Sequence, residues 1–373
     1  MKIICSKELL CENIAIASRA VTTKSSLEIL SCILLVADSK GFRMIGNNLQ
    51  LGIETADIPA EIAETGTVAA EARLLNDIVR RLPHDSVTIV TDERNVIRII
   101  SGHAEFSIVG MSGDEFPYLT EVEKTNRLTM KSEDLREMVK STIFAVSLNE
   151  AKPVMTGELL IADDDKLVMV AVDGFRIAEK SLPRSDSAEN SFAGQMIIPS
   201  TSLSEIVKII GQTSDEEVEA YVIRGCCMFE TPSCRIVTRL IEGEFIKFES
   251  LFSTEFTTVV TVDRALLTEA LERASLITSK DLKKSPVKIS IEGEQMTISS
   301  ISDMGSTTEC LSINTEGKDL IIAFNPRYLL EALRAIGNEK ITIQLLSPLS
   351  PCVITPADDD SYRYLVLPLR LKE

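Results

Sequence analysis

The fold is decided by a stretch near the carboxyl end of the chain, Pro326-Arg-Tyr-Leu-Leu-Glu-Ala-Leu-Arg-Ala-Ile-Gly337. Its apolar residues recur every three or four positions, which predicts a helix with one buried stripe. The same pattern occurs at 72–82 and at 202–211, so the three copies are spaced roughly a third of the chain apart. This recurrence indicates that one structural plan is repeated.

A second amphipathic pattern lies earlier in each third of the chain. It covers residues 8–14, 133–139 and 264–271. Each third is therefore expected to contain two helices. Repetition on this scale is more typical of a geometric task, such as building a ring or a rod, than of a single catalytic centre.

Between the predicted helices the apolar residues alternate, and β-branched residues are bounded by turn residues, which predicts antiparallel strands. The clearest strands are 86–91, 95–101, 287–291, 296–300 and 340–345. We therefore predict an α+β protein of three similar domains, each with two helices on one face of antiparallel sheet. The predicted domains are 1–124, 125–250 and 251–373, and the polar segment 183–194 is expected to be a mobile hairpin loop.

The bulk composition is that of a globular protein. The chain has 373 residues, of which 45% are hydrophobic and 25% charged. No apolar run approaches the roughly 20 residues that span a bilayer, and the start of the chain does not resemble a secretory signal. Eight scattered cysteines without a C-x-x-C pair favour reduced thiols, which indicates a cytoplasmic protein without a zinc site.

The net charge of −17 is unevenly distributed. Basic residues are concentrated in the predicted helices, and the acidic excess lies in strands and loops. If the helices share one side, that side attracts phosphate while the outer surface repels it. The alternative is that these bases merely balance the carboxylates of the same helices.

No motif supports catalysis or a cofactor. The runs Asp163–Asp165 and Asp358–Asp360 lie between apolar strand segments, where turn chemistry explains them better than metal binding. No nucleophile is paired with a base at a recognisable spacing. A phosphohydrolase that uses these aspartates is the enzyme alternative, and it predicts metal binding.

Two segments differ from ordinary strands and turns. In Val170-Ala-Val-Asp-Gly-Phe-Arg-Ile-Ala178 a strand enters a tight Asp-Gly turn and leaves with Phe175 and Arg176. In Tyr364-Leu-Val-Leu-Pro-Leu-Arg-Leu371, Pro368 cannot donate to a sheet, so the tail is expected at or beyond an edge, in an exposed position and without an obvious partner in its own ladder. The alternative is two core strands with an incidental proline.

These segments carry a resemblance to a known family. Val172–Ala178 resembles the T-D-G-[HFY]-R-L-A signature of the bacterial DNA polymerase III β subunit, the sliding clamp, and 365–371 resembles its closing segment. Residues 26–30, 113–117 and 324–330 match further family segments, so the resemblance covers the whole chain. It implies three DNA-clamp domains, a head-to-tail homodimeric ring of six domains and no intrinsic catalysis.

The resemblance also implies partners. Duplex DNA would pass through the ring without sequence readout, and a peptide pocket would receive linear motifs of the replicative polymerase, the clamp loader, repair polymerases, ligase and mismatch-repair proteins. It implies a cytoplasmic, nucleoid-associated location. A three-domain scaffold that never closes into a ring is the alternative among binding proteins.

Residues are carried over position by position. The DNA-facing candidates are Lys24, Arg73, Arg80, Lys140, Lys208 and Arg334. The pocket candidates are Met155, Val172, Gly174, Phe175, Arg176, Ile177, Ile246, Leu251, Asn325, Tyr328, Leu349, Leu367, Pro368, Leu369 and Arg370. The interface candidates are Leu74, Ile78, Phe106, Leu276 and Ile277.

Three details of these assignments are open or depart from the family. Ile78 fits the core as well as an interface. Arg176 and Arg370 are expected to anchor a carbonyl or carboxylate at the pocket rim. Ile246 and Ser250 replace the expected proline and arginine, so one pocket wall is expected to differ in shape and charge. Pro153 and Val154 stand where some clamps place aromatic or polar residues near DNA, so no DNA contact is assigned to them.

Overall fold

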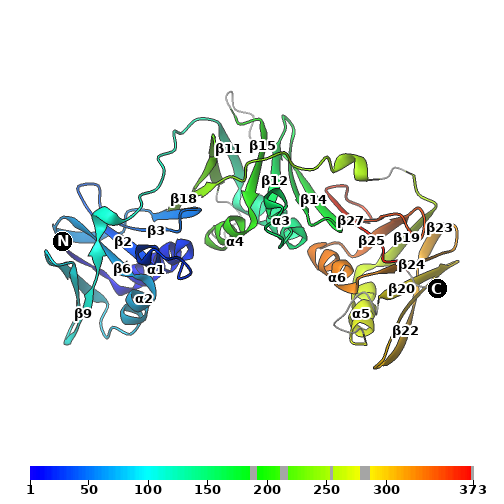
Figure 1. Cartoon of the computed structure of the whole chain (residues 1–373), viewed down its shortest axis with the longest axis horizontal. Helices are drawn as coiled ribbons and strands as arrows, with labels where there is room; N and C mark the ends of the chain where they lie inside the picture. Colours follow the sequence, from blue (N-terminus) through cyan, green and yellow to red (C-terminus); the bar gives the residue numbers. More distant parts are fainter. Residues whose placement is uncertain (185–190, 211–216, 253–254, 278–285, 371–373) are drawn as a thin grey trace. The chain divides into compact units, whose positions relative to one another are not determined.

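The structure is a computed structural model of the whole chain, and it describes all residues except 185–190, 211–216, 253–254, 278–285 and 371–373. The chain divides into two compact units (Figure 1). Unit 1 comprises Met1–Glu133, Ser185–Phe192 and Thr201–Leu240, and unit 2 comprises Asp134–Arg184, Ala193–Ser200 and Ile241–Glu373. The middle third of the chain therefore contributes to both units.

The six predicted helices are all present among the described residues. They are α1 (Lys7–Ala17), α2 (Ala72–Arg80), α3 (Ser132–Thr142), α4 (Ser200–Ile209), α5 (Arg264–Ser275) and α6 (Pro326–Ala335). Several begin at a side-chain cap: Ser6 caps α1, Asp263 caps α5 and Asn325 caps α6, where Pro326 takes the first helical position. None of the described helices is long and apolar enough to cross a membrane.

Unit 1 contains two antiparallel sheets. Sheet A has the order β5 (Ala60–Glu64), β1 (Lys2–Ser6), β7 (Ser86–Thr91), β8 (Val96–Ser101), β9 (Ala104–Val109). Sheet B has the order β10 (Met111–Ser112), β6 (Gly66–Glu71), β2 (Cys32–Ala37), β3 (Phe42–Asn47), β4 (Leu51–Thr55), β18 (Cys234–Arg239), β17 (Cys226–Glu230), β16 (Glu217–Ile223), β11 (Arg127–Lys131).

Unit 2 also contains two antiparallel sheets. Sheet C has the order β15 (Gly194–Pro199), β12 (Gly157–Ala162), β13 (Lys166–Val172), β14 (Arg176–Pro183), β27 (Tyr362–Val366), β26 (Cys352–Pro356), β25 (Lys340–Leu345), β19 (Thr258–Asp263), β23 (Asn314–Gly317). Sheet D has the order β22 (Gly305–Ser312), β21 (Gln295–Ser302), β20 (Val287–Glu292), β24 (Leu320–Phe324).

Sheets B and C each run through a predicted domain boundary. In sheet B, β4 of the first third pairs with β18 of the second, with Ile53 opposite Ile236. In sheet C, β14 of the second third pairs with β27 of the last, with Ile177 opposite Leu365. Each pairing places strands from two thirds of the chain in one hydrogen-bonded ladder.

The helices pack on these sheets through the predicted stripes. In unit 1, Leu75 and Val79 of α2 join Leu10 and Ile14 of α1 in a core with residues of both sheets. In unit 2, α5 and α6 contribute to one core with residues of sheets C and D. The α+β prediction with helices packed on antiparallel sheet is confirmed.

The acidic runs are turns, as predicted. Asp163–Asp165 joins β12 to β13, and the Asp163 amide donates to the Lys166 carbonyl over 3.0 Å. In the turn before β27, the Asp359 carboxylate accepts hydrogen bonds from the amide and hydroxyl of Ser361. The predicted mobile loop at 183–194 includes residues 185–190, which lie outside the described residues.

Candidate functional site

The turn between β13 and β14 is held by an aspartate. The Asp173 carboxylate accepts hydrogen bonds from the amides of Phe175 over 2.8 Å and Arg176 over 3.1 Å. Gly174 has φ +91°, a conformation that favours glycine, and a Cβ built on it would meet nothing within 4 Å. The turn therefore presents an open backbone surface, and the Phe175 side chain beside it is 57% exposed.

The carboxyl-terminal tail lies next to this turn. β27 ends at Val366, so Pro368 lies beyond the sheet, as predicted. The Leu367 amide donates to the Phe175 carbonyl over 2.9 Å, and the Leu369 amide donates to the Ala323 carbonyl over 2.7 Å. The expectation that the tail lacks a partner in its own ladder is wrong for Leu367, whose amide pairs with the turn that leads into the neighbouring strand β14. The Leu369 amide pairs with β24, which belongs to sheet D.

An apolar cluster lies beneath the turn. Met155, Val172 and Ile177, which were predicted as pocket residues, are buried in it, and Ile246 packs against it. The cluster also contains residues absent from the prediction: Leu159, Val168, Val170, Ile197, Phe245, Phe248, Phe252, Val353 and Leu365. The Gly243-Glu-Phe245 corner was the available sequence signal for the phenylalanines, and the resemblance of 365–371 to the family's closing segment was the signal for Leu365. Val353 had no comparable signal.

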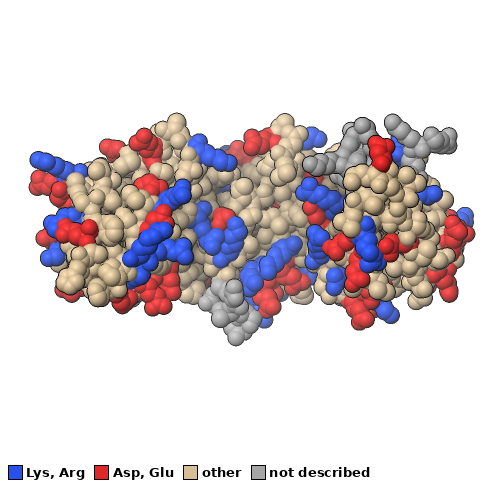
Figure 2. All heavy atoms as spheres, turned by 90° about the horizontal axis from the view of Figure 1, so that it is seen from below, with Lys and Arg blue, Asp and Glu red and all other residues tan. Residues whose placement is uncertain are grey.

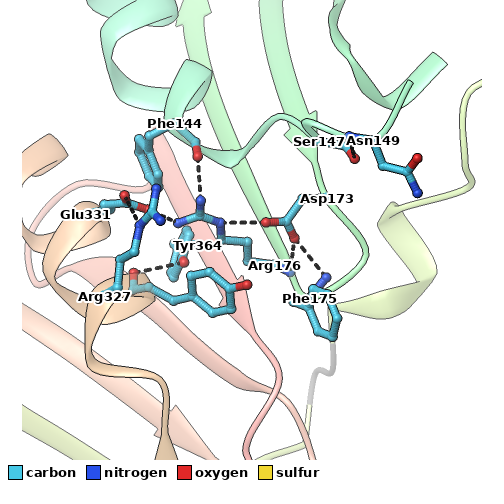
Figure 3. Close-up of polar contacts among 10 residues, drawn as sticks. Phe144, Ser147, Asn149, Asp173, Phe175, Arg176, Arg327, Glu331 and Tyr364 are labelled. Carbon is cyan, nitrogen blue, oxygen red and sulfur yellow. Dashed lines mark hydrogen bonds and ion pairs between the residues drawn. The ribbon is translucent and has the colours of Figure 1, made fainter. Parts of the chain in front are cut away.

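Arg176 is the charged centre of the site. Figure 3 shows its guanidinium between Asp173 and Glu331, with Phe144 and Tyr364 beside it. The guanidinium donates to Asp173 over 2.9 Å, to Glu331 and to the Phe144 carbonyl. Burial alone would lower the pKa of Arg176, but the Tyr364 phenol and the Glu331 carboxylate outweigh burial and raise it.

The rim role predicted for Arg176 is wrong. Its side chain is only 4% exposed, and its hydrogen-bond donors are directed to three acceptors inside unit 2. A buried guanidinium needs such partners because an unpaired charge is costly away from water. Arg370, by contrast, is exposed, so a rim role for Arg370 stays a prediction.

The other pocket candidates fall into two groups. Leu251, Leu349 and Leu367 are exposed, and Pro368 and Leu369 are half-buried. Asn325 is buried and its side-chain oxygen caps α6 by accepting from the Arg327 amide, so its polar group is already engaged. Tyr328 stacks on Phe175 with ring centroids 6.3 Å apart, which brings α6 to the turn.

The DNA-facing candidates are all exposed, but they differ in their partners. Lys208 pairs with Glu205 at 2.7 Å, and Arg334 pairs with Glu272 at 2.8 Å. Among the residues that the structure describes, no ion pair is formed by Lys24, Arg73, Arg80 or Lys140. Figure 2 shows one face of the molecule, on which basic and acidic side chains are intermixed.

Sheets A and D are open, so each has two edge strands in the described part of the chain: β5 and β9 in sheet A, and β22 and β24 in sheet D. β9 pairs only with β8, and β22 pairs only with β21, within the described part of the chain (Figure 1). Phe106 of β9 is exposed, as are Leu74 of α2 and Leu276 beyond α5, whereas Ile277 is half-buried. Ile78 is 7% exposed and packs in the core of unit 1, which corrects its inclusion among the interface candidates.

Comparisons with known proteins agree along the whole chain. Family models of the DNA polymerase III beta subunit match in succession, the N-terminal domain at 1–120, the central domain at 129–247 and the C-terminal domain at 249–370. The Beta sliding clamp of Synechococcus elongatus is 32% identical over 100% of both chains, and that of Staphylococcus epidermidis is 31% identical over 94% of each.

Solved structures are similar in the same way. A putative DNA polymerase III beta subunit from Eubacterium rectale is 35% identical, with a TM-score of 0.95 and 100% of both chains covered. The DNA polymerase sliding clamp from Bacillus subtilis is 27% identical, with the same TM-score and coverage.

Proposed function

The chain belongs to the DNA polymerase III beta subunit family, the sliding clamps, and from this premise we propose that two copies close head to tail into a ring around duplex DNA. A sliding clamp is a processivity factor and not an enzyme. The proposed ring tethers the replicative polymerase to DNA by enclosing the duplex, without reading its sequence.

The observation that carries this proposal is that each unit has a sheet with a free edge, at β9 in unit 1 and at β22 in unit 2. Unpaired edge strands are templates for pairing with another chain. Val109 of β9 is 83% exposed, and Leu276, beyond α5, is 77% exposed, so each unit offers apolar surface in addition to a free edge. If β9 of one copy meets β22 of the next, two identical contacts close a ring and neither of these two strands keeps a free edge.

The helices supply the surface proposed to face DNA. Arg73 and Arg80 of α2, Lys140 of α3 and Lys24 in the loop between α1 and β2 are exposed cations, which suits contacts with phosphates through water. The net charge of −17 opposes tight binding of free DNA. The clamp is therefore proposed to stay on DNA because the closed ring encircles the duplex, and not because it binds DNA tightly.

The partner site is proposed at the turn after β13. The exposed side chains of Phe175 and Leu367 lie beside the turn above the apolar cluster, and the open backbone at Gly174 allows close approach. The exposed Leu349 is proposed to belong to the same surface. Such a surface suits a short, mostly apolar linear segment. We propose that the polymerase, the clamp loader and repair proteins use this site in turn, in the cytoplasm at the nucleoid.

The ring is tested by mass. Multi-angle light scattering at several concentrations is expected to give twice the chain mass of 41.0 kDa. A particle that remains at 41.0 kDa at micromolar concentration would contradict the ring and favour the open three-domain scaffold.

The partner site is tested with a fluorescein-labelled peptide copied from the carboxyl-terminal tail of the cognate replicative polymerase. Leu369→Ala is expected to weaken binding at least tenfold because the side chain is proposed to contact the peptide. The exposed residue Leu27, in the loop before β2 in unit 1, supplies the matched control Leu27→Ala. Unchanged affinity of Leu369→Ala would refute the assignment.

A further inference from the structure

We propose that Glu331 is a positioning residue of the partner site, which acts through Arg176 to fix the Asp173–Phe175 turn and the Tyr328 ring in one arrangement. Glu331 lies on α6 and was not among the predicted site residues. The inference rests on the proposed partner site and adds a residue that no partner needs to touch.

Glu331 has two different partners. One oxygen accepts from Arg176, which is 4% exposed, and the other accepts from the exposed Arg327 over 2.8 Å. Burial would raise the pKa of Glu331, but its hydrogen bonds from Arg327 and Arg176 outweigh burial and lower it. The carboxylate is therefore charged at neutral pH and directed at the buried guanidinium.

The guanidinium in turn supports a stack of rings. It lies 4.4 Å from the centroid of the Tyr328 ring and 5.3 Å from that of Phe144. Tyr328 stacks against the exposed Phe175 at 6.3 Å, and the Tyr328 carbonyl accepts from the Tyr364 hydroxyl over 2.9 Å. The ion pair between Arg176 of β14 and Glu331 of α6 thus supports the Tyr328 ring, on which the exposed Phe175 ring stacks.

Unit 1 contains the same turn without the arginine. Between β3 and β4 the Asn48 side chain accepts from the amides of Gln50 and Leu51, and Leu49 has φ +72°. The Arg239 amide donates to the Gln50 carbonyl over 2.9 Å, as Leu367 does to Phe175. Leu51 occupies the position in this turn that corresponds to Arg176. This kind of turn therefore forms without a guanidinium, so the Arg176–Glu331 ion pair is not needed to fold it.

The experiment compares the two ion pairs of Glu331, the buried one with Arg176 and the exposed one with Arg327. Glu331→Gln removes the charge that holds Arg176, and Arg327→Gln removes the exposed pair alone. With the same fluorescein-labelled polymerase peptide, Glu331→Gln is expected to weaken binding about tenfold, because a site that loses its fixed arrangement must be ordered again on binding. Arg327→Gln is expected to stay within about twofold, because exposed pairs four residues apart on a helix contribute little.

A double-mutant cycle separates positioning from general damage. In a Phe175→Ala background, Glu331→Gln is expected to have little further effect on affinity, because the ring that it positions is absent. If Glu331→Gln fails to fold, Glu331→Asp keeps the charge, shortens the side chain and is expected to give a smaller loss.

Two results would overturn the proposal. One is that Glu331→Gln and Arg327→Gln weaken peptide binding equally, and the other is that the Glu331→Gln effect is undiminished without Phe175. Leu369→Ala distinguishes this failure from failure of the site. If Leu369→Ala weakens binding and Glu331→Gln does not, only the positioning role is wrong, whereas if neither does, the site itself is misplaced.

Discussion

Replacing Glu158 with glutamine is expected to stabilise the protein at neutral pH. Glu158 of β12 is completely buried, and its one described partner is the hydroxyl of Thr142 at the end of α3. The single Thr142 hydroxyl proton is within reach of two acceptors, the Glu158 carboxylate and the Met138 carbonyl at 2.8 Å. When that proton goes to the Met138 carbonyl, a protonated Glu158 can donate its own proton to the Thr142 hydroxyl oxygen. The other Glu158 oxygen, Oε1, is buried and has no partner among the described residues.

Burial raises the pKa of Glu158 from 4.5 to about 8, although the Thr142 hydrogen bond lowers it. The unfolded chain releases this proton above about pH 4.5, whereas the folded protein keeps it until about pH 8, so folding takes up a proton between these values. The stabilising contribution is complete below the lower pKa and falls by about 1.4 kcal/mol per pH unit through this window. At pH 7 the loss is about 3 kcal/mol.

Glutamine has nearly the same shape, donates to the Thr142 hydroxyl through its amide and does not titrate. Glu158→Gln is therefore expected to exceed the parent protein in stability at pH 7 by about 3 kcal/mol and at pH 5 by less than about 1 kcal/mol. Urea unfolding followed by circular dichroism from pH 5 to 8 measures both, with Glu150→Gln on the surface as the control. Unfolding midpoints of Glu158→Gln and parent that stay parallel across this range would refute the reasoning.

Three further changes test other parts of the structure. Asn325→Ala removes the cap of α6 and is expected to cost about 1 kcal/mol of unfolding free energy, measured by urea titration; an unchanged midpoint would contradict the cap. Leu276→Asp places a charge on the apolar surface beyond α5 and is expected to give a particle of 41.0 kDa in light scattering, whereas Leu148→Asp, in unit 2, leaves the dimer intact. The double variant Arg80→Gln/Lys140→Gln is expected to shorten the residence of loaded clamps on circular DNA more than Lys208→Gln/Arg334→Gln, because Lys208 and Arg334 are already paired with Glu205 and Glu272. Equal effects in a surface-bound DNA assay would argue against Arg80 and Lys140 as the phosphate contacts.

Local periodicity was sufficient to predict the elements. The strand expected at 86–91 is β7 (Ser86–Thr91), and the helix expected within 72–82 is α2 (Ala72–Arg80). Each of these patterns is complete within a short window, because burial of one face fixes the spacing of apolar residues. The α+β class and the threefold plan follow from the same windows and are confirmed.

Longer-range features had no local signal. The pairing of β4 with β18 joins residues about 180 positions apart, and nothing in either strand names its partner. The burial of Arg176 was missed for the same reason, because Glu331 and Phe144 lie far from it in sequence. In the sequence, an exposed arginine at a pocket rim cannot be distinguished from a buried one, because only the fold brings together the acceptors of a buried guanidinium.

The ladders that cross the predicted boundaries have a consequence for how the chain breaks. A protease that cuts the connector between β10 and β11, or the one between β18 and β19, severs the covalent chain but leaves the β4–β18 and β14–β27 pairings in place. Nicked molecules are expected to migrate intact in native gels and to separate into fragments only in detergent. The borders between the repeats are therefore not the places at which the folded protein is expected to come apart.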